Sequence, residues 1–178
     1  MSFLRALLRW WAVWALVAAA GMLGAAHGFE RFEGLAPCPL CLQQREAYWA
    51  AIAVAGPAVI WTLISRATGT PRLAAFFLFV AFGTGAFIAT FHAGGEQGWW
   101  ELPATCMGGA SVDVDALAAL AAGTAPAGPL PSCGEVAWSW LGLSMAGWNV
   151  LISLALAPFS LLAAKRPTDA RAPRIEKA

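Results

Sequence analysis

The stretch AYWAAIAVAGPAVIWTLIS, residues 47–65, carries no acidic or basic side chain and is bounded by Glu46 and Arg66. A helix of about 20 apolar residues is long enough to cross the roughly 30 Å hydrocarbon core of a bilayer. Pro57 lies inside the stretch, but membrane-spanning helices tolerate proline because neighbouring helices can satisfy the freed carbonyl group. The stretch therefore predicts a membrane-spanning helix, and this assignment decides the class of fold.

The rest of the chain has the same apolar character. Of the 178 residues, 60% are hydrophobic and only 12% are charged, whereas about 25% of the residues of a soluble domain are charged. Three further stretches without charged residues occupy 10–29, 73–91 and 136–164. We therefore expect an all-α membrane protein, residues 1–178 forming a single integral membrane domain. Its four-transmembrane-helix bundle is expected to have helices at about 10–27, 42–64, 73–92 and 143–164.

The basic residues predict the orientation in the bilayer. In a four-helix arrangement, nine of the eleven lysines and arginines fall on one face, which the positive-inside rule makes cytoplasmic. We expect both termini, the 65–72 loop and the 165–178 tail on that face, in a bacterial inner membrane. Two periplasmic loops are then expected at about 28–41 and 93–142, the second carrying a short surface helix at 113–120. The nine residues are Arg5, Arg9, Arg66, Arg72, Lys165, Arg166, Arg171, Arg174 and Lys177.

An alternative interpretation makes residues 1–26 a signal peptide, because basic residues precede an apolar segment that ends in small residues. Trp10, Trp11 and Trp14 favour an interfacial anchor over a cleavable apolar segment. The net charge of +1 gives no indication of nucleic-acid binding, and we expect the lipid bilayer as the surroundings and no nucleic acid as a partner.

All four cysteines fall in the expected periplasmic loops, Cys38 and Cys41 in the first and Cys106 and Cys133 in the second. Disulfides persist in an oxidising compartment, and four cysteines allow three connectivities. Covalent haem attachment is excluded because Leu42, not histidine, follows the CxxC pair. A zinc site made by the four cysteines is an alternative, but the second pair lacks close ligand spacing, and we expect no metal.

The CxxC pair is best interpreted as redox-active. A purely structural disulfide is the alternative, although it would close too small a loop to restrain the unfolded chain much. If the helix begins near Leu40, Cys41 lies in its first turn, where the helix dipole favours a thiolate. Arg45 shares that face and can stabilise the thiolate or hold an anionic or carbonyl ligand. Arg45 could instead reach lipid headgroups or pair with Glu46 or Glu101.

The second periplasmic loop is rich in glycine and proline, which predicts an irregular and mobile segment. A Cys106–Cys133 bond there would be accessible to another protein and able to exchange; a structural bond worth about 3–4 kcal/mol is the alternative. His92 ends the third expected helix at the same surface as the CxxC pair. A lone histidine in that place is more often an interfacial residue than a functional one.

The chain resembles the bacterial DsbB family of quinone-linked, disulfide-generating membrane proteins. The resemblance covers nearly the whole chain and is carried by CxxC followed by Arg45, the EQGWW segment at 96–100 and the LGLSMAGWN stretch at 141–149. Pro39 within the CxxC departs from the family, in which an apolar residue such as valine is familiar there. Proline removes an amide donor and stiffens the turn, but it spares both sulfurs.

The resemblance implies a relay of dithiols. A periplasmic DsbA-like protein of the thioredoxin fold would react at the Cys106–Cys133 disulfide and form a mixed disulfide with Cys106. Cys133 would then attack Cys38, and Cys41 would pass electrons to a membrane quinone, ubiquinone or menaquinone. By the same resemblance, Arg45 would hold the quinone oxygen, and His92 and Gln97 would lie near the quinone.

Two other functions remain open from the sequence. One is a non-enzymatic four-helix scaffold with structural disulfides. The other is a quinone/thiol enzyme similar to vitamin-K-epoxide reductase, in which the active CxxC is expected late in the helix order; here it precedes the second helix.

Overall fold

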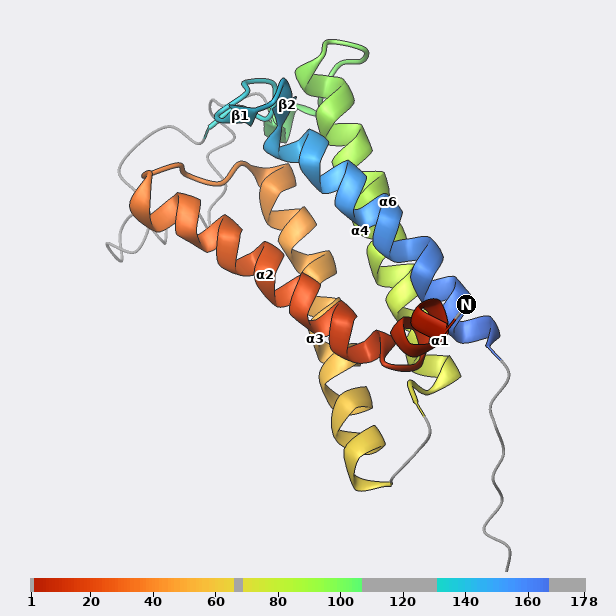
Figure 1. The fold of residues 1–178 in the computed structure, drawn as a ribbon. Coiled ribbons are helices and arrows are strands. Elements are labelled where there is room, and N and C mark those ends of the chain that lie inside the picture. The colour runs from red at the N-terminus through yellow and green to blue at the C-terminus, as the bar shows by residue number, and fades with distance from the viewer. Residues whose placement is uncertain (1, 66–68, 107–130, 167–178) are drawn as a thin grey trace, which may run out of the picture.

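The computed structural model of the protein describes residues 2–65, 69–106 and 131–166. Four helices in this part of the chain are long and apolar enough to cross a membrane, which identifies a multi-pass membrane protein. Figure 1 shows that these long helices make up most of the molecule. The predicted all-α, four-helix membrane fold is confirmed. The helices are α2 (Trp11–Phe32), α3 (Pro39–Ile64), α4 (Arg72–Glu96) and α6 (Met145–Lys165).

The shorter elements lie at the ends of the bundle. They are the helix α1 (Ser2–Arg9), the 3-10 turn η1 (Ala104–Cys106) and the strands β1 (Ser139–Trp140) and β2 (Leu143–Ser144). β1 and β2 form an antiparallel hairpin, whose two connecting residues, Leu141 and Gly142, both have positive φ, as a type I′ turn requires. Ser144 then caps α6 by accepting a hydrogen bond from the Gly147 amide at 3.1 Å. The expected surface helix at 113–120 lies outside the described residues.

The helices continue further toward the expected outer surface than the sequence predicted. α2 ends at Phe32 instead of about residue 27, and α4 ends at Glu96 instead of about residue 92. Each helix stops just before a glycine with positive φ, Gly34 at +68° and Gly98 at +71°. The length of an uncharged stretch therefore predicts the apolar part of a helix, whereas these two helices continue until a glycine adopts a left-handed conformation.

Small side chains bring the helices together. α2 packs on α3, α3 on α4, and α4 on α6 over the longest interface (Figure 1). The core contains mostly alanines with a few large side chains, which is typical of membrane helices whose backbones approach closely. Large apolar side chains such as Trp61, Ile64 and Phe87 are exposed on the outside, where a bilayer would cover them. Fully buried core residues include Ala15, Ala19, Ala51, Ala55, Ala75 and Leu78.

Gly85 lies where three helices meet, and we predict that a larger side chain there destabilises the bundle. A Cβ atom at Gly85 would lie 3.3 Å from the Ala47 Cβ and 3.5 Å from the Ser153 Oγ. Gly85→Leu is therefore expected to lower the free energy of unfolding by about 1–3 kcal/mol through overpacking. Thermal unfolding in detergent measures the change. Gly83→Leu is the matched control, because nothing lies within 4 Å of a Cβ at Gly83; equal destabilisation by both variants would contradict the packing argument.

Candidate active site

The CxxC pair occupies the first turn of α3. Cys38 is the N-cap residue, with φ −76° and ψ 166°, and its sulfur accepts a hydrogen bond from the Cys41 amide at 3.2 Å. Pro39 begins the helix, a position where the missing N–H costs nothing because it has no partner within the helix. The sequence departure at Pro39 therefore suits the helix start. Cys38 is buried, whereas Cys41 is partly exposed.

The second pair of cysteines lies against the first. The Cys133 amide donates to the Cys106 carbonyl oxygen at 2.8 Å, so residues 27 positions apart in the sequence become neighbours. Cys38, Cys106 and Cys133 share one buried cluster with Leu40, and Cys41 packs against it. All four cysteines are free thiols in the structure. Sequence reasoning placed them on one side of the membrane; the structure brings all four to one place, which we call the sulfur cluster.

Burial changes the accessibility expected for the second pair. Cys106 is 2% and Cys133 0% exposed, so the structure does not present them at the surface as the loop composition suggested. A free cysteine behaves as a small hydrophobic side chain, and these two pack into the sulfur cluster beside the partly buried Leu102. Any molecule that reacts with Cys106 must therefore first displace part of this cover.

The acidity of the buried thiols follows from the same packing. Burial, followed by the neighbouring Cys133 thiol, raises the pKa of Cys106 to about 12. The neighbouring Cys41 side chain and then burial raise the pKa of Cys38 above its ordinary value. Because the thiolate is the reactive form, both thiols are poor nucleophiles in this arrangement.

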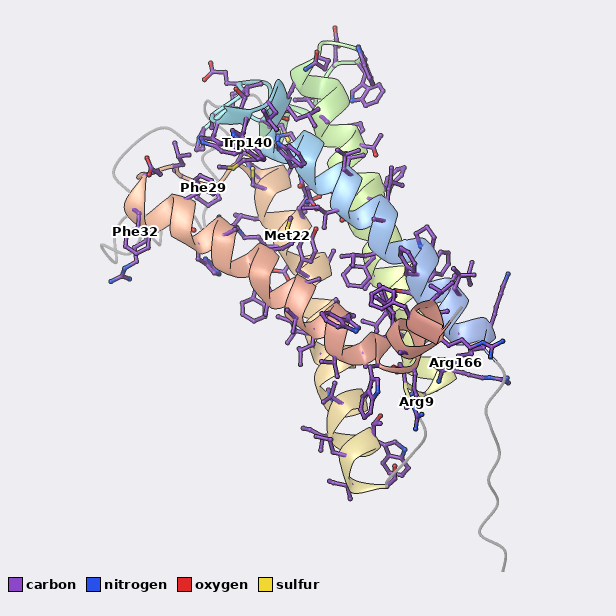
Figure 2. All side chains as sticks on the ribbon, viewed as in Figure 1. Arg9, Met22, Phe29, Phe32, Trp140 and Arg166 are labelled. Carbon is purple, nitrogen blue, oxygen red and sulfur yellow. The ribbon has the colours of Figure 1, made fainter. Side chains whose placement is uncertain are left out.

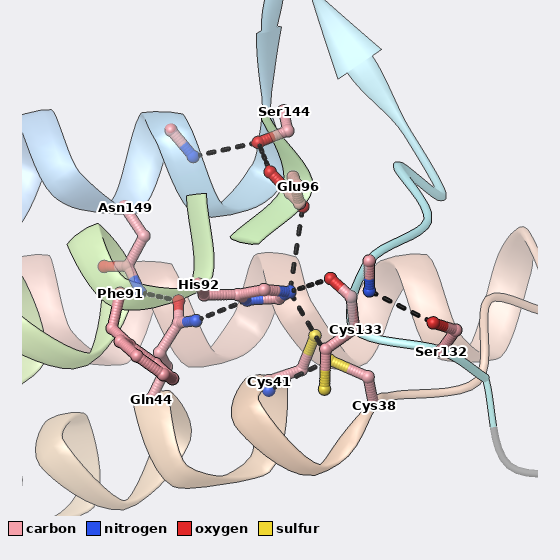
Figure 3. Close-up of polar contacts among 12 residues, drawn as sticks. Cys38, Cys41, Gln44, Phe91, His92, Glu96, Ser132, Cys133, Ser144 and Asn149 are labelled. Carbon is pink, nitrogen blue, oxygen red and sulfur yellow. Dashed lines mark hydrogen bonds and ion pairs between the residues drawn. The ribbon is translucent and has the colours of Figure 1, made fainter. Parts of the chain in front are cut away.

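His92 lies at the centre of the site, between the sulfur cluster and the helix bundle (Figure 3). It is 4% exposed. Its Nε2 lies 3.1 Å from the Cys133 carbonyl oxygen and 3.7 Å from the Cys38 sulfur, and its Nδ1 lies 2.8 Å from the Gln44 Nε2. A carbonyl oxygen only accepts and an amide nitrogen only donates, so these contacts require a neutral ring with its proton on Nε2. The predicted position of His92 near the cysteines agrees with this geometry.

A chain of buried polar groups fixes that ring. Gln44 receives a hydrogen bond on its Oε1 from the Asn149 amide, while the Tyr48 hydroxyl donates to the Asn149 Oδ1. Ser153 adds a further contact, 3.0 Å from the Tyr48 hydroxyl. Sequence reasoning missed Gln44, Tyr48 and Asn149. Asn149 carried a usable signal, because a polar side chain inside a membrane-spanning helix is costly and often functional.

An apolar cavity of about 280 Å³ opens between α2, α3 and α6. Cys41 lines it, together with Gln44, Arg45 and His92, and the other three cysteines do not. Aromatic side chains form much of the wall. Figure 2 labels three wall residues, Met22 and Phe29 on α2 and Trp140 on β1. The wall also includes Trp138, Trp148 and Ile152.

Arg45 stands at the wall of this cavity with a fixed partner. Its Nη1 donates to the Glu30 Oε2 at 2.7 Å, and its Nη2 to the Ala26 carbonyl oxygen at 3.4 Å. The partner is therefore Glu30 on α2, neither Glu46 nor Glu101. The Arg45 side chain is 13% exposed, and the five donors of its guanidinium group exceed what these contacts use, so it can still donate to a ligand in the cavity.

The structure separates Gln97, which the resemblance placed near the quinone, from its neighbour Glu96. Gln97 is the exposed C-cap residue of α4 and does not line the cavity. The side chain of Glu96 is 5% exposed, and its Oε1 lies 3.7 Å from the His92 Nε2. Its Oε2 accepts a hydrogen bond from the Ser144 hydroxyl (Figure 3). Glu96 lies one helical turn after His92 and so on the same face, a spacing that sequence reasoning could have used.

Similar proteins identify the family of the chain. The family model for disulfide bond formation protein DsbB matches residues 8–163. The chain belongs to the DsbB family. A DsbB-family protein of Marinobacter nauticus, named disulfide bond formation protein B, is 32% identical over 177 residues, covering 90% of this chain and 96% of its own length. The protein of the same name from Methylococcus capsulatus is 31% identical over 155 residues, covering 80% of this chain and 85% of its own.

No solved structure gives a significant match to the chain. The DsbB family identity makes the protein a membrane oxidoreductase of disulfide bond formation. It favours the enzymatic interpretation of the four cysteines over that of a scaffold with structural disulfides.

Proposed function

We propose that the protein reoxidises a periplasmic DsbA-like thiol oxidase and passes the electrons to a membrane quinone, ubiquinone or menaquinone. The observation that carries the proposal is the division of the sulfur cluster. Cys41 lines the apolar cavity, while Cys38, Cys106 and Cys133 pack behind it on the side of the loop segments. Such a division can connect a water-soluble dithiol to a lipid-soluble acceptor.

The cavity has the chemistry that a quinone ring requires. Ligand sites are mostly apolar with a few placed polar groups, and this one combines aromatic walls with Arg45, His92 and Gln44. Arg45 can donate to a ring oxygen. A bound quinone would supply a two-electron acceptor that also takes up two protons. Gln97 has no place in this proposal, because it does not line the cavity.

The cysteines provide the path for the electron pair. The thiolate of the partner attacks Cys106 in a Cys106–Cys133 disulfide, which forms a mixed disulfide and releases Cys133 as a thiolate. Cys133 then attacks Cys38 in a Cys38–Cys41 disulfide and releases the Cys41 thiolate toward the cavity. Each step is a thiolate attack on a disulfide, and His92, which contacts both Cys38 and the Cys133 backbone, lies where the two pairs meet.

The second half of the exchange restores the outer pair. The second thiol of the partner resolves the mixed disulfide and releases Cys106, which attacks Cys133 and frees Cys38. Cys38 and Cys41 then give up two electrons and join again as a disulfide. The net reaction oxidises one dithiol of the partner and reduces one quinone to quinol.

The same proposal places the protein in the bacterial inner membrane, with both termini cytoplasmic and the cysteines periplasmic. The distribution of basic residues supports this orientation. The chemistry supports it as well, because the periplasm is kept oxidising by DsbA, DsbB and quinone.

A coupled assay tests the proposal. Purified protein in detergent is mixed with a reduced thioredoxin-fold oxidase and a short-chain ubiquinone, and the loss of quinone absorbance is followed with the thiol content of the partner. We expect one quinone reduced for every two thiols oxidised, over many turnovers. Thiol oxidation without quinone consumption, or quinone reduction without the partner, would refute the relay. A labelling experiment with a membrane-impermeant thiol reagent on intact spheroplasts tests the orientation separately.

A further inference from the structure

Three metal-binding side chains come together at the start of α3. The sulfurs of Cys38 and Cys41 and a ring nitrogen of His92 all lie within 4.8 Å of one another. We propose that the reduced CxxC pair and His92 bind one thiophilic divalent cation, such as Zn²⁺ or Cd²⁺. This site differs from a zinc site of four cysteines, and it does not depend on quinone being the electron acceptor.

The distances fit the ion with small side-chain movements. Tetrahedral zinc has Zn–S bonds of about 2.3 Å and Zn–N bonds of about 2.0 Å, which sets sulfur and nitrogen about 3.6 Å apart. The Cys38 sulfur lies 3.7 Å from the His92 Nε2. Cys38 is already oriented toward the ring, since it is held at the N-cap by the Cys41 amide. Two thiolates on one zinc lie about 3.8 Å apart. Because the Cys38 and Cys41 sulfurs lie within 4.8 Å of each other, the Cys41 sulfur must move toward Cys38 by at most about 1 Å.

The fourth coordination position faces the cavity. Cys41 and His92 both line the cavity, so water can complete the coordination as it does at open zinc sites. The buried carboxyl group of Glu96 lies 3.7 Å from the His92 Nε2, and a cation beside it would favour its ionised form. The ion would therefore occupy the end of the cavity where Cys41 lies, and it would compete with any ligand that needs that sulfur.

Metal binding demands a change of tautomer at His92. The hydrogen-bond partners of His92 assign the proton to Nε2, which lies 3.1 Å from the Cys133 carbonyl oxygen, whereas an Nε2-bound ion requires the proton on Nδ1. The Gln44 amide, 2.8 Å from Nδ1, must then turn its oxygen toward the ring. A carboxylate at position 44 would accept that proton better, because metal-bound histidines commonly donate their second nitrogen to a carboxylate.

The site exists only in one redox state. Binding removes the protons of two thiols to solvent and changes no oxidation state, whereas a Cys38–Cys41 disulfide offers no thiolate. A cation would therefore bind only the reduced protein and prevent its Cys38–Cys41 dithiol from transferring electrons. Zinc or cadmium in the surrounding compartment would act as a selective inhibitor of the reduced form.

The test is a cadmium titration of the reduced full-length protein in detergent, followed by the ultraviolet charge-transfer band of cadmium thiolate, with Zn²⁺ affinity measured by chelator competition. We expect one ion per chain in the reduced protein and none in the protein oxidised at Cys38 and Cys41. His92→Ala is expected to weaken binding by at least about 100-fold, since even groups that only orient a ligand contribute about 10- to 100-fold. Gln44→Glu is expected to tighten it by about tenfold.

The double variant Cys106→Ser/Cys133→Ser is the matched control and is expected to retain the affinity within about twofold. Loss of binding in this control would assign the ion to the other cysteines and overturn the proposal. Equal binding to the oxidised protein, or no binding to the reduced protein, would overturn it too. If His92→Ala does not fold, His92→Gln and the oxidised wild type decide the question.

Discussion

Cys41→Ser is expected to abolish quinone reduction, lowering its rate by at least about 1,000-fold, because loss of a nucleophile removes the covalent step. Cys41 is the one cysteine of the four that lines the cavity, so no other sulfur can replace it without rearrangement of α3. The Cys106–Cys133 disulfide of the proposed relay would survive the change. The variant should therefore still oxidise one equivalent of the partner and then stop, since Cys38 alone cannot accept the electron pair.

Rapid mixing of the variant with reduced partner, followed by thiol trapping and mass spectrometry, measures that single equivalent. Cys106→Ser is the comparison, because it removes the disulfide that the partner attacks and should oxidise no partner at all. Sustained turnover by Cys41→Ser would show that another sulfur reduces the acceptor. A single equivalent from Cys106→Ser would place the partner's attack elsewhere.

The fold was predictable because membrane spans depend on composition. Uncharged stretches such as residues 47–65 and 73–91 are long enough to span a bilayer. The placement of the basic residues supported a count of four spanning helices. The helix ends were harder to predict. Gly34 and Gly98 end two helices beyond the apolar stretches, and the hairpin at 139–144 depends on positive φ at Leu141, which leucine rarely adopts.

Site residues were predictable where their type and spacing indicate a reaction. They were not predictable where their role depends on contacts between helices. The four cysteines and Arg45 stand out by type and spacing. The roles of Gln44 and Asn149 depend on contacts between α3 and α6 across 105 positions, which a single sequence does not reveal. Gln97 and Glu96 are adjacent, and only the helix phase, which puts Glu96 on the His92 face, separates the exposed residue from the buried one.

Arg45→Ala is expected to raise the apparent KM for quinone by about 10- to 100-fold, because hydrogen bonds to charged groups contribute about 1.5–3 kcal/mol. Glu30 holds the guanidinium at the cavity wall through the 2.7 Å contact, so Arg45 would meet the proposed quinone already oriented. Arg45→Lys keeps the charge but loses the planar fork, and its KM should fall between those of the wild type and Arg45→Ala. The KM for the protein partner should stay nearly constant in both variants, because Arg45 lies outside the sulfur cluster.

Glu30→Gln distinguishes donation by Arg45 to the quinone from the orientation of Arg45 by Glu30. It retains the guanidinium and removes only the charge of its partner, which is 41% exposed, and exposed ion pairs contribute about 0–1 kcal/mol. We therefore expect Glu30→Gln to raise the KM for quinone by less than about fivefold, well below the effect of Arg45→Ala. Steady-state kinetics at varied quinone and fixed partner concentration measures both. If Arg45→Ala leaves the KM for quinone unchanged, Arg45 only ties α3 to α2; if both variants raise it equally, orientation by Glu30 and not donation by Arg45 controls quinone use.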